Sequence, residues 1–232
     1  MAQGRSRSQP RVQRERAGRG AARRLRTREG EVDAVVLVGL TGSIGAGKST
    51  ALSLFRKLGA LTISADELVH GLYAQPELRA QLVVRFGPAV VDARGEVDRN
   101  RLAESVRGRR GELRWLEKLT HPRVAEETER RIREAPAGAV IVCEVPLLFE
   151  SHYEGAFDLV VTVEAGRETR RQRSIHRFDL AMFSELEKLQ VSSERRVADS
   201  DLAFFNDGDV EQLCVFVQEA YGRALGLLRE GS

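Results

Sequence analysis

A glycine-rich segment with one lysine and two hydroxyl side chains follows an apolar run near residue 40. Residues 42–49, GSIGAGKS, fit the pattern GxxxxGK[ST] in full, between the apolar run AVVLVGL and the amphipathic stretch ALSLFRKL. Glycines let successive backbone N–H groups turn into one concavity, and a helix that starts there adds its positive end. Phosphates are the ligands that such a loop holds best. The segment therefore predicts a nucleoside triphosphate site.

Individual roles within this P-loop follow from the chemistry of its side chains. Lys48 is expected to reach the β- and γ-phosphates of ATP, and the Ser49 hydroxyl to complete the coordination of a bridging Mg²⁺. Thr50 is expected to help start the helix. The other nucleotide-binding candidates are Gly42, Ser43, Gly45, Ala46 and Gly47. The alternative is a glycine-rich turn with an exposed lysine, and the loop alone does not select a reaction, because many chemistries share it.

An acidic residue at the end of the second apolar run, Asp66 in TISADE, is the candidate for proton transfer. In a parallel sheet this strand end lies beside the P-loop. Its carboxylate could accept a hydroxyl proton from an acceptor near the γ-phosphate, or help to hold Mg²⁺. Aspartate is also a common helix N-cap, and Asp66 before ELVHGL suits that role. Its position favours the catalytic interpretation.

A basic cluster follows the fourth apolar run. Arg173 and Arg177 stand four residues apart, on one face of a helix. An arginine pair over the phosphates would neutralise charge on the transferred group, best on a mobile lid that excludes water. The alternative is a solvated basic face. The other members of the cluster are Arg167, Arg170 and Arg171.

The elements that must position these residues alternate apolar runs with amphipathic stretches. This order predicts an α/β fold with a parallel five-stranded sheet, which together with the P-loop resembles the P-loop NTPase fold of nucleoside-monophosphate kinases. About 75 residues of helical periodicity between the second and third runs predict a helical substrate-binding insertion over about 66–136, and residues 172–197 a small helical lid. The candidate strands are 34–40, 60–64, 139–145, 158–164 and 201–205.

Composition fits one domain with an insertion in a chain of 232 residues, 42% of them hydrophobic and 31% charged. No apolar run is long enough to span a membrane. Residues 1–28 hold ten arginines and one acid, against a net charge of +3 for the whole chain, so the rest is net acidic. We expect a disordered tail over 1–32 and a folded P-loop domain over 33–232. Alternatives for the tail are an arm for RNA or a membrane surface, and a targeting presequence.

A series of motifs resembles the dephospho-CoA kinase family in order and approximate spacing, over residues 34–215. The most distinctive are WLEKLTHP at 115–122 and VPLLFE at 145–150; the others are GLTGSIGAGKST, SAD at 64–66, DRNRL at 98–102, the Arg173/Arg177 pair and SDLAFFNDG at 200–208. The resemblance implies transfer of a phosphoryl group from ATP to the ribose 3′-hydroxyl of 3′-dephospho-CoA. This reaction gives CoA and ADP and is the last step of coenzyme A biosynthesis. The two cysteines, Cys143 and Cys214, lie far apart in apolar contexts, so we expect them to be reduced thiols in the core. Reduced thiols are typical of the cytoplasm, where we expect this enzyme to act.

Site residues carry over from this resemblance one by one. Asp66 resembles the family's general base, Lys48 its phosphate clamp and Arg177 its lid arginine. The substrate side would comprise His121 and Pro122 of the HP element with Pro146, Leu147, Leu148 and Glu150 of PLLFE, whereas Asn206 and Gly208 would lie near the adenine. A structural histidine and a buried strand end are the alternatives for His121 and for PLLFE.

The chain also departs from the family pattern. Ser64 stands where an acid is usual two residues before the general base, Phe178 follows Arg177 where an acid is usual, and the lid segment is about two residues short. Another small-molecule kinase, of the nucleoside-monophosphate or shikimate type, is the alternative function. A nucleic-acid-binding ATPase would depend on the arginine tail, and nucleic acid is not the partner we expect. The pattern gives no indication of the oligomeric state.

Overall fold

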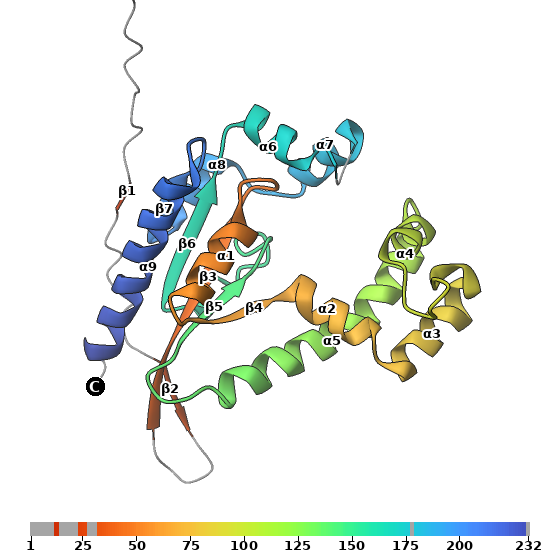
Figure 1. Ribbon diagram of the computed structural model, residues 1–232, viewed down its shortest axis with the longest axis horizontal. Coiled ribbons are helices and arrows are strands. Elements are labelled where there is room, and N and C mark those ends of the chain that lie inside the picture. The colour runs from red at the N-terminus through yellow and green to blue at the C-terminus, as the bar shows by residue number, and fades with distance from the viewer. Residues whose placement is uncertain (1–11, 14–22, 27–31, 177–178, 231–232) are drawn as a thin grey trace, which may run out of the picture. The chain divides into compact units, whose positions relative to one another are not determined.

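The computed structural model describes residues 12–13, 23–26, 32–176 and 179–230 (Figure 1). Contacts between residues divide the chain into two compact units. The first comprises residues 1–62 and 135–232, and we call it the nucleotide unit; the second comprises residues 63–134, and we call it the helical unit.

The five strands predicted from the apolar runs are all present, each within two residues of its expected ends. They form a parallel sheet in the order β7-β6-β3-β5-β4, so that β3 lies in the middle. The sequence prediction of a five-stranded parallel α/β fold is therefore confirmed. The strands are β3 (Val32–Gly42), β4 (Leu61–Ser64), β5 (Val140–Glu144), β6 (Leu159–Glu164) and β7 (Leu202–Phe205).

Two short strands lie within the arginine-rich segment, where the sequence predicts no regular structure. β1 (Val12–Gln13) pairs antiparallel with β7, and β2 (Arg23–Arg26) pairs antiparallel with β3. The rest of residues 1–31 lies outside the described residues, so disorder of that remainder stays a prediction.

Burial on both faces explains the apolar strands. Leu159, Val161 and Val163 of β6 join the core formed with α1 (Lys48–Lys57) and α9 (Val210–Glu230), whereas Val160 packs in a second cluster with Leu148 and Phe149. Successive strand residues point to opposite faces, so both clusters follow from one uninterrupted apolar run. Phe204 of β7 stacks on Phe216 of α9 with ring centroids 5.0 Å apart.

The helical unit confirms the predicted run of helices between the second and third strands. Its core includes Leu78 and Leu82, which are almost fully buried, and Phe86 meets the only tryptophan of the chain, Trp115, edge-on at 5.6 Å. Its elements are α2 (Ala65–Tyr73), α3 (Pro76–Phe86), the short helix η1 (Pro88–Val90), α4 (Arg99–Val106) and α5 (Arg110–Arg133).

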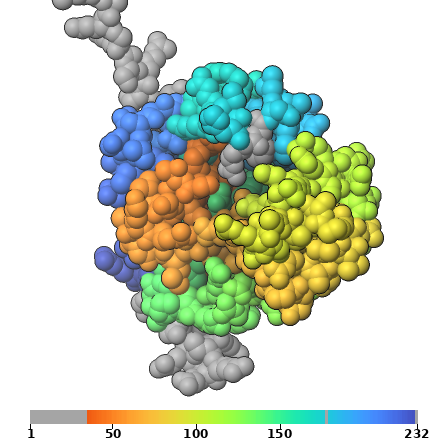
Figure 2. All heavy atoms as spheres, turned by 45° about the vertical axis from the view of Figure 1, so that its right-hand side comes forward, coloured from red at the N-terminus to blue at the C-terminus, as the bar shows by residue number. Residues whose placement is uncertain are grey.

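Short elements complete the nucleotide unit: η2 (Glu154–Ala156), α6 (Arg167–Ser174), α7 (Leu180–Lys188) and α8 (Ser193–Asp199). Asp179 caps α7 and Ser192 caps α8, each by accepting a backbone N–H at the start of its helix. In the space-filling view the teal segment that holds α6 lies beside the light-blue segment that holds α7 (Figure 2). Within the described residues, the helices are all too short or too polar to span a bilayer.

Candidate functional site

Three glycines shape the loop between β3 and α1. Gly42, Gly45 and Gly47 have φ angles of 141°, 75° and 104°, which side chains of L-residues disfavour. A Cβ on Gly42 would lie 1.8 Å from the carbonyl oxygen of Val163 in β6, and one on Gly47 would lie 2.5 Å from Nδ2 of Asn206. The glycines of the motif are therefore required by both backbone conformation and space.

Lys48 folds back over the loop that precedes it. The residue is buried, and its Nζ donates hydrogen bonds to the carbonyl oxygens of Gly42 and Ser43, each at 3.0 Å. Ser49 and Thr50 are exposed in the first turn of α1, where the positive end of the helix favours anions. Gly47 is the N-cap residue, and Thr50 is the third residue of α1, so it does not cap the helix.

The loop after β7 packs against the phosphate-binding loop. Asn206 is buried, and its Nδ2 donates to the carbonyl oxygen of Ala46 at 2.8 Å. Arg173 of α6 donates from Nη1 to the carbonyl oxygen of Asn206 at 2.8 Å. The structure thus brings together three segments that lie more than 120 residues apart at their extremes. Gly208 follows two residues later in the same loop.

The basic cluster divides into residues with different partners. Arg167 and Arg170 both pair with Glu187 of α7, at 3.0 and 2.8 Å, and Arg171 pairs with Glu168 within α6. Arg173 is the member whose guanidinium reaches the loop beside the phosphate-binding segment. Arg177 and Phe178 lie outside the described residues, so the role of Arg177 stays a prediction.

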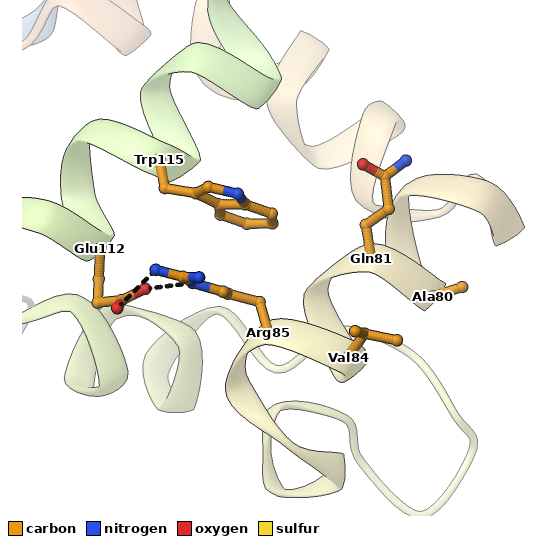
Figure 3. A pocket seen from close by; sticks show the side chains of 6 residues that line it. All are labelled: Ala80, Gln81, Val84, Arg85, Glu112 and Trp115. Carbon is orange, nitrogen blue, oxygen red and sulfur yellow. Dashed lines mark hydrogen bonds and ion pairs between the residues drawn. The ribbon is translucent and has the colours of Figure 1, made fainter.

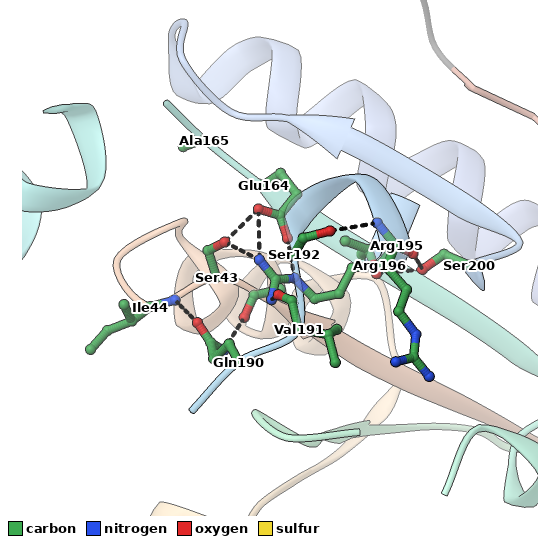
Figure 4. A network of polar contacts seen from close by, with 12 residues as sticks. Ser43, Ile44, Glu164, Ala165, Gln190, Val191, Ser192, Arg195, Arg196 and Ser200 are labelled. Carbon is green, nitrogen blue, oxygen red and sulfur yellow. Dashed lines mark hydrogen bonds and ion pairs between the residues drawn. The ribbon is translucent and has the colours of Figure 1, made fainter. Parts of the chain in front are cut away.

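A buried polar network, absent from the sequence predictions, holds the start of the phosphate-binding loop (Figure 4). The hydroxyl of Ser43 contacts Glu164, the last residue of β6, and Arg196 of α8. Gln190, between α7 and α8, accepts from the N–H of Ile44 at 3.0 Å. The one available signal in the sequence was an acid, Glu164, at the end of a mostly apolar strand.

The VPLLFE segment after β5 contains residues of opposite exposure. Pro146 and Leu147 are exposed, whereas Leu148 is fully buried beside Phe149, in the turn that follows β5. Glu150 accepts the N–H of Val191 at Oε1, 2.6 Å away; its buried Oε2 has no hydrogen-bond partner among the described residues. Pro146 and Leu147 are therefore the exposed members of this segment, and Glu150 is half-buried.

The helical unit carries Asp66, His121 and Pro122. Asp66 is exposed in the first turn of α2, whose N-cap is Ser64, so the alternative interpretation of Asp66 as the cap is not what the structure shows. His121 and Pro122 are exposed within α5. All three side chains are thus accessible on helices of this unit.

Two pockets also lie in the helical unit. The first is lined by α3 and α5, where Arg85 pairs with Glu112 at 2.8 Å and lies 5.5 Å from the ring centroid of Trp115 (Figure 3). It contains none of the predicted site residues. The second is lined by α2 and α5; there Arg130 and Arg131 lower the pKa of Glu127 to about 2 through hydrogen bonds and charge.

The donor set suits a magnesium ion held mainly by phosphate. Among the described residues, no group of three or more His, Cys, Asp or Glu side chains is arranged to hold a metal ion. The exposed hydroxyl of Ser49 is a hard oxygen donor at the helix start. This arrangement fits Mg²⁺, which prefers few protein ligands together with water and phosphate oxygens.

Comparisons with known proteins agree with this geometry. A family model described as dephospho-CoA kinase matches residues 36–212. A dephospho-CoA kinase of Burkholderia pseudomallei is 37% identical over 193 residues, covering 81% of this chain and 95% of the relative. The dephospho-CoA kinase of Aquifex aeolicus is 32% identical over 186 residues, covering 79% and 95%.

Solved structures show the same fold. A Thermus thermophilus protein, TT1252, superposes with a TM-score of 0.64 at 30% identity, covering 82% of this chain and 95% of that one. A dephospho-CoA kinase from Campylobacter jejuni gives a TM-score of 0.59 at 21% identity, covering 82% and 97%. The match of the family model over most of the chain, with relatives above 30% identity, shows that the chain belongs to the dephospho-CoA kinase family.

Proposed function

We propose that this chain transfers the γ-phosphoryl group of ATP to the ribose 3′-hydroxyl of 3′-dephospho-CoA, giving CoA and ADP. The observation that carries the proposal is the glycine-shaped loop with Lys48 at the start of α1, in a chain of the dephospho-CoA kinase family. The alternative acceptors, shikimate or a nucleoside monophosphate, are not favoured by that family membership.

The nucleotide unit would bind and orient the triphosphate. Backbone amides from Gly42 to Lys48 and the positive end of α1 would surround the phosphates. Lys48 is bonded to loop carbonyls in this structure, and its ammonium group could exchange those partners for β- and γ-phosphate oxygens without leaving the loop. Arg173, beside Asn206, would add a positive charge near the nucleotide.

Magnesium would be held by the Ser49 hydroxyl and the phosphates. The chemistry that such an ion would supply is neutralisation of negative charge on the β- and γ-phosphates. The exposed position of Ser49 in the first turn of α1 supports this role.

The acceptor would be activated by Asp66. Its carboxylate is exposed in the first turn of α2, so it is free to accept the 3′-hydroxyl proton as attack on the γ-phosphorus begins. We assign acceptor contacts to His121 and Pro122 of α5 and to Pro146, Leu147 and Glu150 after β5, and charge neutralisation from the lid to Arg177. Leu148, with no exposed surface, supports this segment by packing.

A coupled assay of ADP release tests the function directly. Purified protein with Mg-ATP should turn over dephospho-CoA, and it should ignore shikimate and nucleoside monophosphates. Asp66→Asn should bind ATP normally and lower kcat at least about a hundredfold, the scale of a lost general base. Glu67→Gln, the neighbouring acid in the same helical turn, is the matched control and should retain activity. Turnover of another acceptor alone would contradict the proposal.

The arginine-rich segment is assigned no catalytic role, and the protein is proposed to act in the cytoplasm. A nucleic-acid arm would bind with an affinity that falls steeply as salt is added. Removal of residues 1–22 should leave kcat and KM for both substrates within about twofold, since the family match begins at residue 36. A large loss of turnover would contradict this assignment.

A further inference from the structure

The side chain of Ser43, in the phosphate-binding loop, is held by two buried charged groups. Its Oγ donates to Oε2 of Glu164 at 2.5 Å and accepts from Nη2 of Arg196 at 2.5 Å. Ser43 is 1% exposed, so water does not compete for these contacts. The Ser43 hydroxyl therefore anchors the phosphate-binding loop to Glu164 and Arg196.

Glu164 and Arg196 also bind each other, so that most of their hydrogen-bonding atoms have a partner. Nε of Arg196 lies 2.6 Å from Oε1 of Glu164, and Nη2 lies 3.3 Å from Oε2. Nη1 of Arg196 donates to the carbonyl oxygen of Val191. Arg196 and Glu164 are 3% and 1% exposed. Since the Glu164–Arg196 pair is neutral overall, it fixes the position of the Ser43 side chain and adds no net charge to the site.

Packing alone does not require charges at this position. Val160, on the same face of β6 as Glu164, is fully buried and apolar. Replacing a buried ion pair by apolar residues of similar volume is often neutral or favourable for stability. What distinguishes the Glu164–Arg196 pair from an apolar pair is therefore that it holds the Ser43 hydroxyl at the start of the loop.

A second set of contacts reaches the same loop from the same segment. The Gln190 amide accepts from the N–H of Ile44 at 3.0 Å and donates to the carbonyl oxygen of Gly42 at 3.2 Å. Ser200 Oγ donates to the carbonyl oxygen of Arg196 at 2.7 Å, which ties the end of α8 to the helix backbone. Residues 190–196 thus contact three successive residues of the loop, 42–44 (Figure 4).

We propose that Glu164 and Arg196 are positioning residues for nucleotide binding: through the Ser43 hydroxyl they fix the loop in its phosphate-binding conformation before ATP arrives. Donors that are already in place need no reorganisation when charge develops. The inference rests on the proposed function only in taking residues 42–49 as the triphosphate site. It extends that function to residues which do not touch the substrates.

Three variants test this role by direct calorimetric measurement of ATP affinity, with kcat and KM recorded alongside. Ser43→Ala removes the hydroxyl, and Arg196→Lys keeps the charge but loses the forked geometry. The double variant Glu164→Leu/Arg196→Met replaces the pair by apolar side chains. Arg195→Lys, next to Arg196 in α8 and 53% exposed in its side chain, is the matched control.

The expected result separates positioning from simple support of the fold. All variants should show cooperative thermal unfolding, and the melting temperature of each is recorded so that ATP affinity is compared only between folded proteins. Each should nevertheless bind ATP at least about tenfold more weakly, a change of about one decade in Kd. Arg195→Lys should stay within about twofold. Wild-type affinity for ATP in the apolar pair would overturn the proposal.

A double-mutant cycle adds a readout that general loss of stability does not move. If Arg196 acts through Ser43, adding Arg196→Lys to Ser43→Ala should weaken ATP binding much less than it does in the unchanged protein. Effects that simply multiply would overturn the proposal. Because these measurements use ATP alone, a protein that binds ATP and ignores dephospho-CoA would contradict the acceptor assignment and not this inference.

Discussion

Gly42→Ala is the substitution whose effect the structure defines most sharply. Gly42 ends β3 and begins the phosphate-binding loop, with φ at 141°. The added Cβ would lie 1.8 Å from the carbonyl oxygen of Val163 and 2.8 Å from its carbonyl carbon. These are backbone atoms of the neighbouring strand, so no side-chain rotation relieves the contact. β3 and β6 would have to separate by about 1 Å at the site.

The cost has two parts. Backbone strain of a non-glycine residue at such a φ angle lowers the free energy of unfolding by about 1–3 kcal/mol. The overlap with β6 adds to this loss, so we expect the free energy of unfolding to fall by at least about 3 kcal/mol. For a chain of this size that corresponds to a Tm lower by about 6–12 °C. The displaced loop should also bind ATP more than about tenfold more weakly, because its amides no longer converge.

Thermal unfolding and ATP calorimetry check this prediction together. The matched control is Gly222→Ala in the same unit, at an exposed position of α9 where an added Cβ meets no atom within 4 Å. It should raise stability by about 0.5–1 kcal/mol, the usual gain of alanine over glycine within a helix. A Gly42→Ala protein that melts within about 2 °C of the unchanged one and binds ATP equally well would refute the close approach of β3 and β6.

Further predictions concern the loop lysine, a buried thiol and the helical unit. Lys48→Ala should lower kcat/KM for ATP by about a hundredfold or more, whereas Lys57→Ala, exposed at the end of the same helix, should not. Burial raises the pKa of Cys143 to about 12. As pH rises above about 9, the unfolded chain therefore loses this thiol proton before the folded chain does, which favours unfolding. In urea unfolding, the free energy of unfolding should fall with pH by up to about 1.4 kcal/mol per pH unit more steeply in the unchanged protein than in Cys143→Val. The same pH dependence in both proteins would contradict the burial of this thiol. Leu82→Ala truncates a side chain with 0% exposure and should lower the free energy of unfolding by about 2–5 kcal/mol. The fluorescence of Trp115, in the same unit, measures this unfolding.

Local pattern predicted the main elements because each carries its own physical signature. Residues 35–40 of the run AVVLVGL are buried, on both faces of β3, and an apolar run of that length has few other stable environments. The glycines of GSIGAGKS sit at three left-handed φ angles, which only their lack of a Cβ permits. Identical reasoning located the helices between β4 and β5 from their periodicity.

Sequence reasoning was less able to sort neighbours within a motif. Leu147 and Leu148 look equivalent in VPLLFE, yet one is 38% exposed and the other fully buried, because the chain turns after β5 and directs them differently. Asp66 and Ser64 both suit a helix start, and the backbone makes Ser64 the N-cap. Such choices depend on one or two backbone angles that composition does not specify.

The sequence by itself determined the strand–loop–helix unit with Lys48 and the family to which the chain belongs, since both depend on residues close together in the chain. Only the tertiary structure decided which distant groups meet. Glu164 and Arg196 are 32 residues apart, and Ser43 lies 121 residues before Glu164. No local spacing encodes their contact, because it arises when β6 pairs beside β3 and α8 packs against β6. Burial then makes each group depend on the others for its hydrogen bonds.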